Sequence, residues 1–187
     1  ETGLLGLTTK SFLPNYGEFY EMRQFTQGPR KARTVVYDGR EVPFGPQLLF
    51  AAQQMEELVV SAEVCEDVWC PVPPSIEAAR EGAVLIANCS ASDETIGKAS
   101  YRRSLIEGQS ARLICGYIYA NAGEGESSQD LVFGGHNLIC ENGSILKEAK
   151  RFINQTIYGD LDIRRLVTER RKMTTYPPAD TALSLIH

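Results

Sequence analysis

The sequence predicts a layered α/β sandwich built on a mixed sheet. Apolar runs with strand character alternate with helical patterns through the middle of the chain, at 58–65, 76–81, 83–89 and 97–113. This alternation is typical of parallel strands joined by crossover helices. Outside this part, Asp38-Gly39 and Asn142-Gly143 each join two apolar runs, and these dipeptides favour tight turns between antiparallel strands. Parallel and antiparallel pairs together make a mixed sheet.

The outer elements are less regular. We expect a buried strand at 3–10, a polar and aromatic loop at 11–28, strands at 34–37, 47–50 and 115–120, a hairpin series at 130–133, 136–140 and 144–146, and a helix at 162–173. Ser75 is the expected N-cap of the helix at 76–81, and Gly82 is suited to follow its last turn. Residues 177–187 are expected to form a tail.

Bulk properties exclude several classes of protein. The chain has 187 residues, enough for one domain, of which 43% are hydrophobic and 23% charged. No apolar run approaches the roughly 20 residues that span a bilayer, so no membrane partner is expected. A net charge of −5 without a basic stripe argues against nucleic acid. Five cysteines, an odd number set in or beside apolar runs, favour a reducing, cytoplasmic location.

Cys65 is the candidate nucleophile. It ends the apolar strand at 58–65, and a turn and helix follow, which is where α/β enzymes place reactive groups. A small buried core cysteine is the alternative, and position alone does not decide between them. Because Glu66 and Asp67 would raise the pKa of a neighbouring thiol, a cation or a general base is required nearby. Lys10 ends the first expected strand and could lie at the same sheet edge as Cys65.

Four sequence blocks resemble the nitrilase-type glutaminase domain of glutamine-dependent NAD synthetases. The blocks are KSFLPNYGEFYE at 10–21, CEDVWCPVPPS at 65–75, ANCSAS at 87–92 and GEGES at 123–127. The resemblance extends to about Met173 and implies an αββα sandwich, four-layered on dimerisation, in a carbon-nitrogen hydrolase domain at 1–176. In this view the first strands and helix of that domain are missing from the chain.

The resemblance also implies roles for individual residues. Cys65 would form a thioester with the γ-carbonyl of glutamine, while Lys10 and the backbone N–H of Glu66 would bind the oxyanion. Glu18 matches a second, supporting glutamate. Residues that match the glutamine-binding positions are Tyr16, Glu66, Trp69 and Ser92. No residue matches the general-base glutamate of the Glu-Lys-Cys triad, so the chain alone is expected to lack steady turnover.

The implied parent enzyme is an ATP-dependent ligase of NAD biosynthesis. Its glutaminase part would need no cofactor or metal, and ammonia would pass to a synthetase domain that uses ATP and Mg²⁺. No Ser-Gly-Gly pyrophosphate loop occurs in this sequence, so that domain is expected to be absent. The expected partners are glutamine, further copies in a homo-oligomer, and the missing parts of the same protein.

Other candidate sites are weaker. Cys65 and Cys70 lack a second pair of zinc ligands, and Cys70, Cys89, Cys115 and Cys140 are better explained as core or wall cysteines. His136 follows two glycines and is expected at a turn or surface rather than beside a catalytic cysteine. The loop at 123–127 carries two acids that would repel phosphate, and is expected near the active site without a catalytic role.

Basic residues cluster on two expected helices. They are Arg102 and Arg103 on the first, and Arg164, Arg165, Arg170, Arg171 and Lys172 on the second. Solvent-exposed faces explain them most simply, and an interface between copies is the alternative. Two other functions also stay open: a stand-alone nitrilase-type amidase or carbamoylase acting on a small amide, and a packing or interaction module without catalysis.

Overall fold

A seven-stranded mixed sheet forms the centre of the molecule, and a computed structural model describes it over residues 3–126, 130–176 and 185–186. The strand order is β10-β4-β5-β6-β7-β8-β9. The bounds are β4 Leu49–Ala52, β5 Met55–Val64, β6 Leu85–Ser90, β7 Gly116–Asn121, β8 Leu138–Glu141, β9 Ser144–Glu148 and β10 Leu185–Ile186. β5, β6 and β7 are mutually parallel, and β4, β8 and β9 pair antiparallel with their neighbours. The predicted α/β class and mixed sheet are confirmed.

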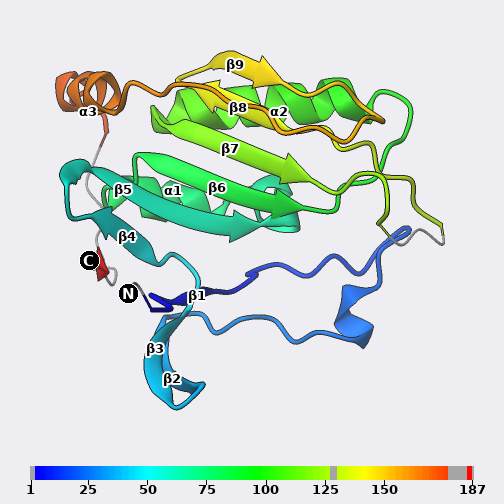
Figure 1. Cartoon of the computed structure of the whole chain (residues 1–187), viewed down its shortest axis with the longest axis horizontal. Coiled ribbons are helices and arrows are strands. Elements are labelled where there is room, and N and C mark those ends of the chain that lie inside the picture. The colour runs from blue at the N-terminus through cyan, green and yellow to red at the C-terminus, as the bar shows by residue number, and fades with distance from the viewer. Residues whose placement is uncertain (1–2, 127–129, 177–184, 187) are drawn as a thin grey trace.

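Two helices cover one face of this sheet. α1 (Pro74–Arg80) and α2 (Lys98–Leu113) lie behind β5 to β8 in Figure 1. Their apolar residues and the inward residues of the strands form one buried cluster that includes Ile86, Ile106 and Leu138. α3 (Ile163–Lys172) packs at the start of β6 and β7 through a second cluster around Val84 and Leu166. None of the helices in the described part of the chain is long and apolar enough to cross a bilayer.

A second, three-stranded sheet contains the beginning of the chain. Its order is β1-β3-β2, with bounds β1 Leu7–Thr8, β2 Arg33–Tyr37 and β3 Arg40–Gly45. It lies below the central sheet in Figure 1. The prediction of a buried strand at 3–10 is wrong, because only two residues pair, and Leu4 and Leu5 are each 46% exposed. The turn at Asp38-Gly39 is confirmed, but β2 pairs with β3 rather than with the run at 47–50.

Several local predictions need correction. Pro73, not Ser75, occupies the N-cap position of α1, and the Ser75 amide donates to Glu63 instead. Residues 130–133 form no strand, only one bridge between Phe133 and Asp93. Within the predicted tail, 177–184 and 187 lie outside the described residues, while Leu185–Ile186 pairs parallel to β4.

The cysteines divide into two groups. Cys115 and Cys140 are buried, as predicted, and burial raises the pKa of each thiol to about 12. Cys70 is half-buried. The prediction is wrong for Cys89, which is exposed because its side chain points to the face of β6 opposite α1 and α2. Within the described residues, no group of three or more His, Cys, Asp or Glu could hold a metal ion.

The parallel strands bring three loops to one edge. Val64 at the end of β5 is in register with Cys89, and Ser90 at the end of β6 is in register with Asn121. The segments that follow these strands therefore lie side by side at their carboxyl ends. This edge contains the candidate site.

Candidate active site

Cys65 begins a short 3₁₀ helix, Cys65–Trp69, directly after β5. Its φ of 49° lies in the left-handed region, which is strained for a residue with a side chain. Asn88 holds this conformation from β6. Its Oδ1 accepts from the Cys65 amide at 3.2 Å, and its Nδ2 donates to the Cys65 carbonyl at 3.5 Å. A buried side chain thus fixes both peptide groups of the candidate nucleophile.

A buried acid lies behind Asn88. Glu63 is in register with Asn88, is 2% exposed, and accepts hydrogen bonds from the Tyr117 hydroxyl and, at 3.0 Å, from the Ser75 amide. Burial raises the pKa of Glu63, although these hydrogen bonds act in the opposite direction. The side chain of Gln109 extends the network from α2 by donating to Ser75 Oγ at 3.1 Å. Glu63, Ser75 and Gln109 are therefore joined by hydrogen bonds beneath the Cys65 turn.

Asp67 connects the Cys65 turn to the beginning of the chain. It is 0% exposed, and its Oδ2 accepts from the Val64 amide at 2.9 Å. Its Oδ1 accepts from the amides of Ser11 at 3.0 Å and Phe12 at 2.9 Å. Burial raises the pKa of Asp67, while the three amides lower it. One carboxyl group therefore attaches the 11–28 loop to the candidate site.

A cavity of about 560 Å³ opens above Cys65. Its walls contain six residues that the sequence singled out: Tyr16, Glu18, Cys65, Glu66, Trp69 and Ser92. These residues come from the 11–28 loop, the Cys65 turn and the loop after β6. The structure thus brings together residues from three separate blocks of sequence. The roles assigned to them stay predictions.

The polar and aromatic groups of this cavity have defined partners. The Tyr16 hydroxyl donates to Glu66 Oε1, and this hydrogen bond to a carboxylate raises the pKa of Tyr16. Trp69 and Tyr101 meet edge to face with ring centroids 5.3 Å apart. The cavity therefore combines a carboxylate with aromatic side chains, a mixture of few polar groups and apolar surface that is typical of ligand sites.

Lys98 is a site residue that the sequence reasoning missed. It lines the same cavity from the first turn of α2, pairs with Asp93, and lies over the rings of Phe19 and Trp69 at 5.5 and 5.9 Å. It adds an ammonium, paired with Asp93, to the cavity that Glu66 also lines. The only sequence signal was its place after Gly97 at the predicted helix start, next to the block at 87–92.

Lys10 is not placed as predicted. It belongs to the loop after β1, in the three-stranded sheet, and its ammonium pairs with Glu21 at 2.5 Å. Together they line a neighbouring cavity of about 710 Å³ that touches Val64 but not Cys65. The expectation that Lys10 and Cys65 end strands of one sheet is wrong, because β1 pairs with β3 and not with β5.

Cys70 differs from Cys65 in its setting. Its Sγ lies 3.4 Å from the Glu66 carbonyl oxygen, and burial together with Glu66 raises its pKa to about 11. At neutral pH it is a thiol and a poor nucleophile. Cys65 lines the open cavity and Cys70 does not.

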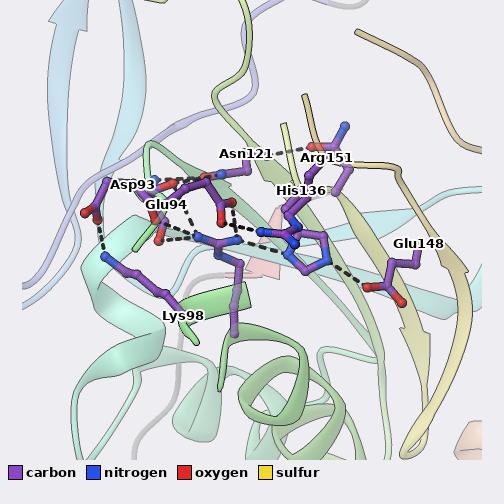
Figure 2. A network of polar contacts seen from close by, with 10 residues as sticks. Asp93, Glu94, Lys98, Asn121, His136, Glu148 and Arg151 are labelled. Atoms are coloured by element: carbon purple, nitrogen blue, oxygen red, sulfur yellow. Dashed lines mark hydrogen bonds and ion pairs between the residues drawn. The ribbon is translucent and has the colours of Figure 1, made fainter. Parts of the chain in front are cut away.

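The Ser92 wall of the cavity rests on a buried guanidinium. Arg102 is 0% exposed, and its Nη2 donates to Ser92 Oγ at 3.2 Å and to the Asp93 carbonyl at 2.9 Å. Its Nη1 contacts Glu94 Oε1 at 2.8 Å and His136 Nδ1 at 2.9 Å. Figure 2 shows Glu94 and His136 converging here, with Glu148 on the far side of the imidazole.

This network overturns two predictions. Arg102 does not lie on a solvent-exposed face, and His136, at 2% exposure, is not a surface histidine. Arg170 also departs from the expected exposed cluster, because its Nε donates to the carbonyls of Leu113 and Ile114 at 3.1 and 3.0 Å. In the 123–127 loop, Gly123 lines a separate cavity with Asn121 and Asn137, while Ser127 lies outside the described residues.

Comparison with known proteins shows which proteins this chain is related to. A glutamine-dependent NAD(+) synthetase from Mycobacterium bovis is 45% identical over 176 residues, covering 92% of this chain and 26% of that protein. The crystal structure of a glutamine-dependent NAD(+) synthetase from Cytophaga hutchinsonii superposes with a TM-score of 0.67 at 32% identity, covering 79% of this chain and 23% of the other. The chain is a homologue of one segment of these synthetases.

The chain spans about a quarter of the length of these relatives. A carbon-nitrogen hydrolase from Helicobacter pylori shares the fold alone, with a TM-score of 0.58 at 19% identity over 87% of this chain and 54% of the other. No family model matches the sequence. The superpositions on solved structures confirm the nitrilase-type fold class expected from the sequence.

Proposed function

We propose that this chain carries the glutamine-hydrolysing site of a glutamine-dependent NAD synthetase. The observation that carries the proposal is the cavity above Cys65, whose wall combines this thiol with the Glu66 carboxylate, which accepts from Tyr16, and the Lys98 ammonium, which pairs with Asp93. Free glutamine has an ammonium and a carboxylate at one end and a carboxamide at the other. The cavity offers a partner of opposite charge to each ionic group.

In the proposed reaction, Cys65 Sγ attacks the γ-carbonyl carbon of glutamine and a carbon–sulfur bond forms. The carbon–nitrogen bond then breaks, and the nitrogen leaves as ammonia with the proton that the Cys65 thiol gives up. Water hydrolyses the thioester to glutamate and returns the thiol. The fixed left-handed backbone at Cys65 would keep the nucleophile in place during these steps.

Glu66 would act twice in this proposal. Its carboxylate would bind the ammonium of glutamine, and its backbone N–H would donate to the developing oxyanion. Lys98 would bind the α-carboxylate, Trp69 would cover the methylene groups, and Ser92 would donate to or accept from the polar end. Glu18, at the cavity wall, keeps the supporting role that the family resemblance implies.

Lys10 would act on the oxyanion only after leaving Glu21. It lines a cavity that Val64, the residue before Cys65, also lines, so this role requires a rearrangement of the Lys10 side chain. Without that rearrangement, Lys10 contributes through electrostatic attraction alone. The general base of the triad has no counterpart among these residues.

The wider function follows from the relatives. Ammonia would pass to a synthetase domain that uses ATP and Mg²⁺ to amidate nicotinic acid adenine dinucleotide, in a cytoplasmic homo-oligomer. The glutaminase step would use no cofactor. An amidase acting on small amides is the competing function, and the charged ends of the cavity favour an amino acid amide over it.

Protection of Cys65 from alkylation tests the proposed site. The chain is treated with iodoacetamide, and each cysteine is followed by peptide mass spectrometry with exposed Cys89 as the internal reference. L-glutamine should slow the labelling of Cys65 relative to Cys89, while D-glutamine and acetamide should not. Equal protection by acetamide would support the simple amidase, and no protection by any amide would refute a carboxamide site.

A further inference from the structure

His136 is buried beside the candidate site and is not among the residues that line the cavity above Cys65. Its Nδ1 lies 2.9 Å from Arg102 Nη1, and its Nε2 lies 2.9 Å from Glu148 Oε1. A guanidinium can only donate hydrogen bonds, so Nδ1 must accept. Nε2 therefore carries the hydrogen and donates it to Glu148, as the dashed contact in Figure 2 indicates. The geometry defines a neutral imidazole with one required tautomer.

The other side of Arg102 reaches the cavity wall. Its Nη2 holds Ser92 Oγ and the Asp93 carbonyl, and Asn121 completes the arrangement. Asn121 Oδ1 accepts from the Ser92 amide at 2.8 Å, and its Nδ2 donates to the Ser92 carbonyl at 2.9 Å. Asn121 thus fixes the backbone of Ser92, and the orientation of the Arg102 guanidinium fixes the Ser92 hydroxyl.

We propose that His136 is a positioning residue for the glutamine site, acting on Ser92 through Arg102. This inference rests on the proposed function of the cavity. As a neutral acceptor, His136 fixes the rotation of the guanidinium and leaves Nη2 directed at Ser92 and Asp93. A second proton on Nδ1 would set two cations against each other at hydrogen-bond distance. The guanidinium would then turn away, and the hydrogen bond from Arg102 Nη2 to the Ser92 hydroxyl would be lost.

The charges around the imidazole come from four segments of the chain. Arg102 and Arg103 belong to α2, Glu94 follows β6, Glu148 belongs to β9, and Arg151 follows β9. Glu148 is shared, because Arg103 Nε lies 3.6 Å from its Oε2, and Glu94 is shared with Arg151 at 3.3 Å. Each carboxylate near the imidazole already has a cationic partner. A protonated His136 would therefore add a fourth cation to a cluster in which three arginines already face two carboxylates.

Two substitutions separate positioning from simple packing. His136→Asn keeps an acceptor near the Nδ1 position and cannot gain a proton, whereas His136→Leu keeps the volume and removes the acceptor. Tyr176→Phe is the control for a lost hydrogen bond far from the cavity, since the Tyr176 hydroxyl donates to the Leu113 carbonyl at 3.0 Å. Thermal unfolding reports whether each variant folds.

Glutamine affinity and amide resonances are then measured for the unaltered chain and for each variant. His136→Leu should raise the glutamine dissociation constant about fivefold to tenfold, because Arg102 loses its acceptor. His136→Asn should change the dissociation constant less than about twofold. In nitrogen-15 spectra, the amides of Ser92 and Asn121 should shift in His136→Leu and stay in place in His136→Asn and Tyr176→Phe.

Each outcome decides the inference independently of the proposed function. If the Ser92 amide resonance is unchanged in His136→Leu, or if His136→Leu binds glutamine as the unaltered chain does, His136 is not a positioning residue. If the amides shift in His136→Leu but the unaltered chain does not bind glutamine, the coupling of His136 to Ser92 holds. The proposed glutamine site is then refuted.

Discussion

The carboxyl edge of the central sheet and the first 45 residues form the two halves of the candidate site, and they are held in different ways. At the sheet edge, Cys65, Ser92 and their supports are fixed by buried groups such as Asn88, Arg102 and Asp67. The early segment has a three-stranded sheet, exposed apolar side chains and a lysine paired with a partly exposed glutamate. The nucleophile and the binding wall are thus preorganised. Lys10, by contrast, is held by one partly exposed ion pair.

Asp67 is the junction between these regions, and its removal should have the largest effect. Asp67→Ala leaves the amides of Val64, Ser11 and Phe12 without their acceptor, at a cost of about 3 kcal/mol of unfolding free energy. Asp67→Asn should retain the link through Oδ1 and lose less. Denaturant unfolding gives the energies, and hydrogen exchange at Ser11 and Phe12 reports the link. Unchanged exchange in Asp67→Ala would show that the 11–28 loop is held by other contacts.

Asn88 belongs to the sheet edge alone. Asn88→Ala should cost about 2 kcal/mol, because the Cys65 amide loses its buried acceptor and the left-handed turn loses its support. Iodoacetamide labelling should also change at Cys65 while Cys89 is unaffected. Tyr176→Phe provides the control, since it removes a hydrogen bond remote from the turn. Equal labelling of Cys65 in both variants would argue against a role for Asn88 in holding the nucleophile.

The sheet edge was predictable because it depends on local patterns. An apolar strand ending at Cys65, a second ending near Ser90 and the parallel-strand rule are enough to bring their loops together. The pairing of β1 with β3 involves only two residues, and no pattern in the run at 3–10 distinguishes it from pairing with β5. Lys10 was therefore assigned to the wrong sheet.

Arg102 and His136 were missed for a different reason. An arginine on an amphipathic helix and a histidine after two glycines both suggest solvent. In the structure, Arg102 and His136 contact each other, and Glu94 and Glu148 are their acidic partners, so both side chains can be buried. The network joins residues that are up to 57 positions apart in the sequence, as Glu94 and Arg151 are. Sequence spacing does not reveal such a network.

Glu63 allows a pH test of the buried edge. Burial raises its pKa above the unfolded value, so the fold prefers the protonated carboxyl. Its stabilising contribution is present below the unfolded pKa of about 4.3 and is lost as the pH rises through the folded value. Glu63→Gln mimics the protonated form and lacks this loss. Relative to the unaltered chain, the variant should gain about 1 to 2 kcal/mol as the pH rises.

Unfolding free energies of both proteins across the pH range check this expectation. Asp67, whose pKa is also raised by burial, is present in both chains, so its contribution cancels in the difference. A difference that stays constant with pH would mean that Glu63 has the same proton affinity in the folded and unfolded chain.

Lys10 should give the smallest effect on stability. Lys10→Met removes an ion pair whose side chains are 14% and 28% exposed, and partly exposed pairs contribute about 1 kcal/mol or less. The informative measurement is instead the alkylation rate of Cys65. If Lys10 supports the thiolate only when released, Glu21→Gln should speed labelling by freeing the ammonium, whereas Lys10→Met should not. If neither variant changes the rate, Lys10 has no influence on Cys65 in this chain, and its region serves the site only through the loop that Asp67 holds.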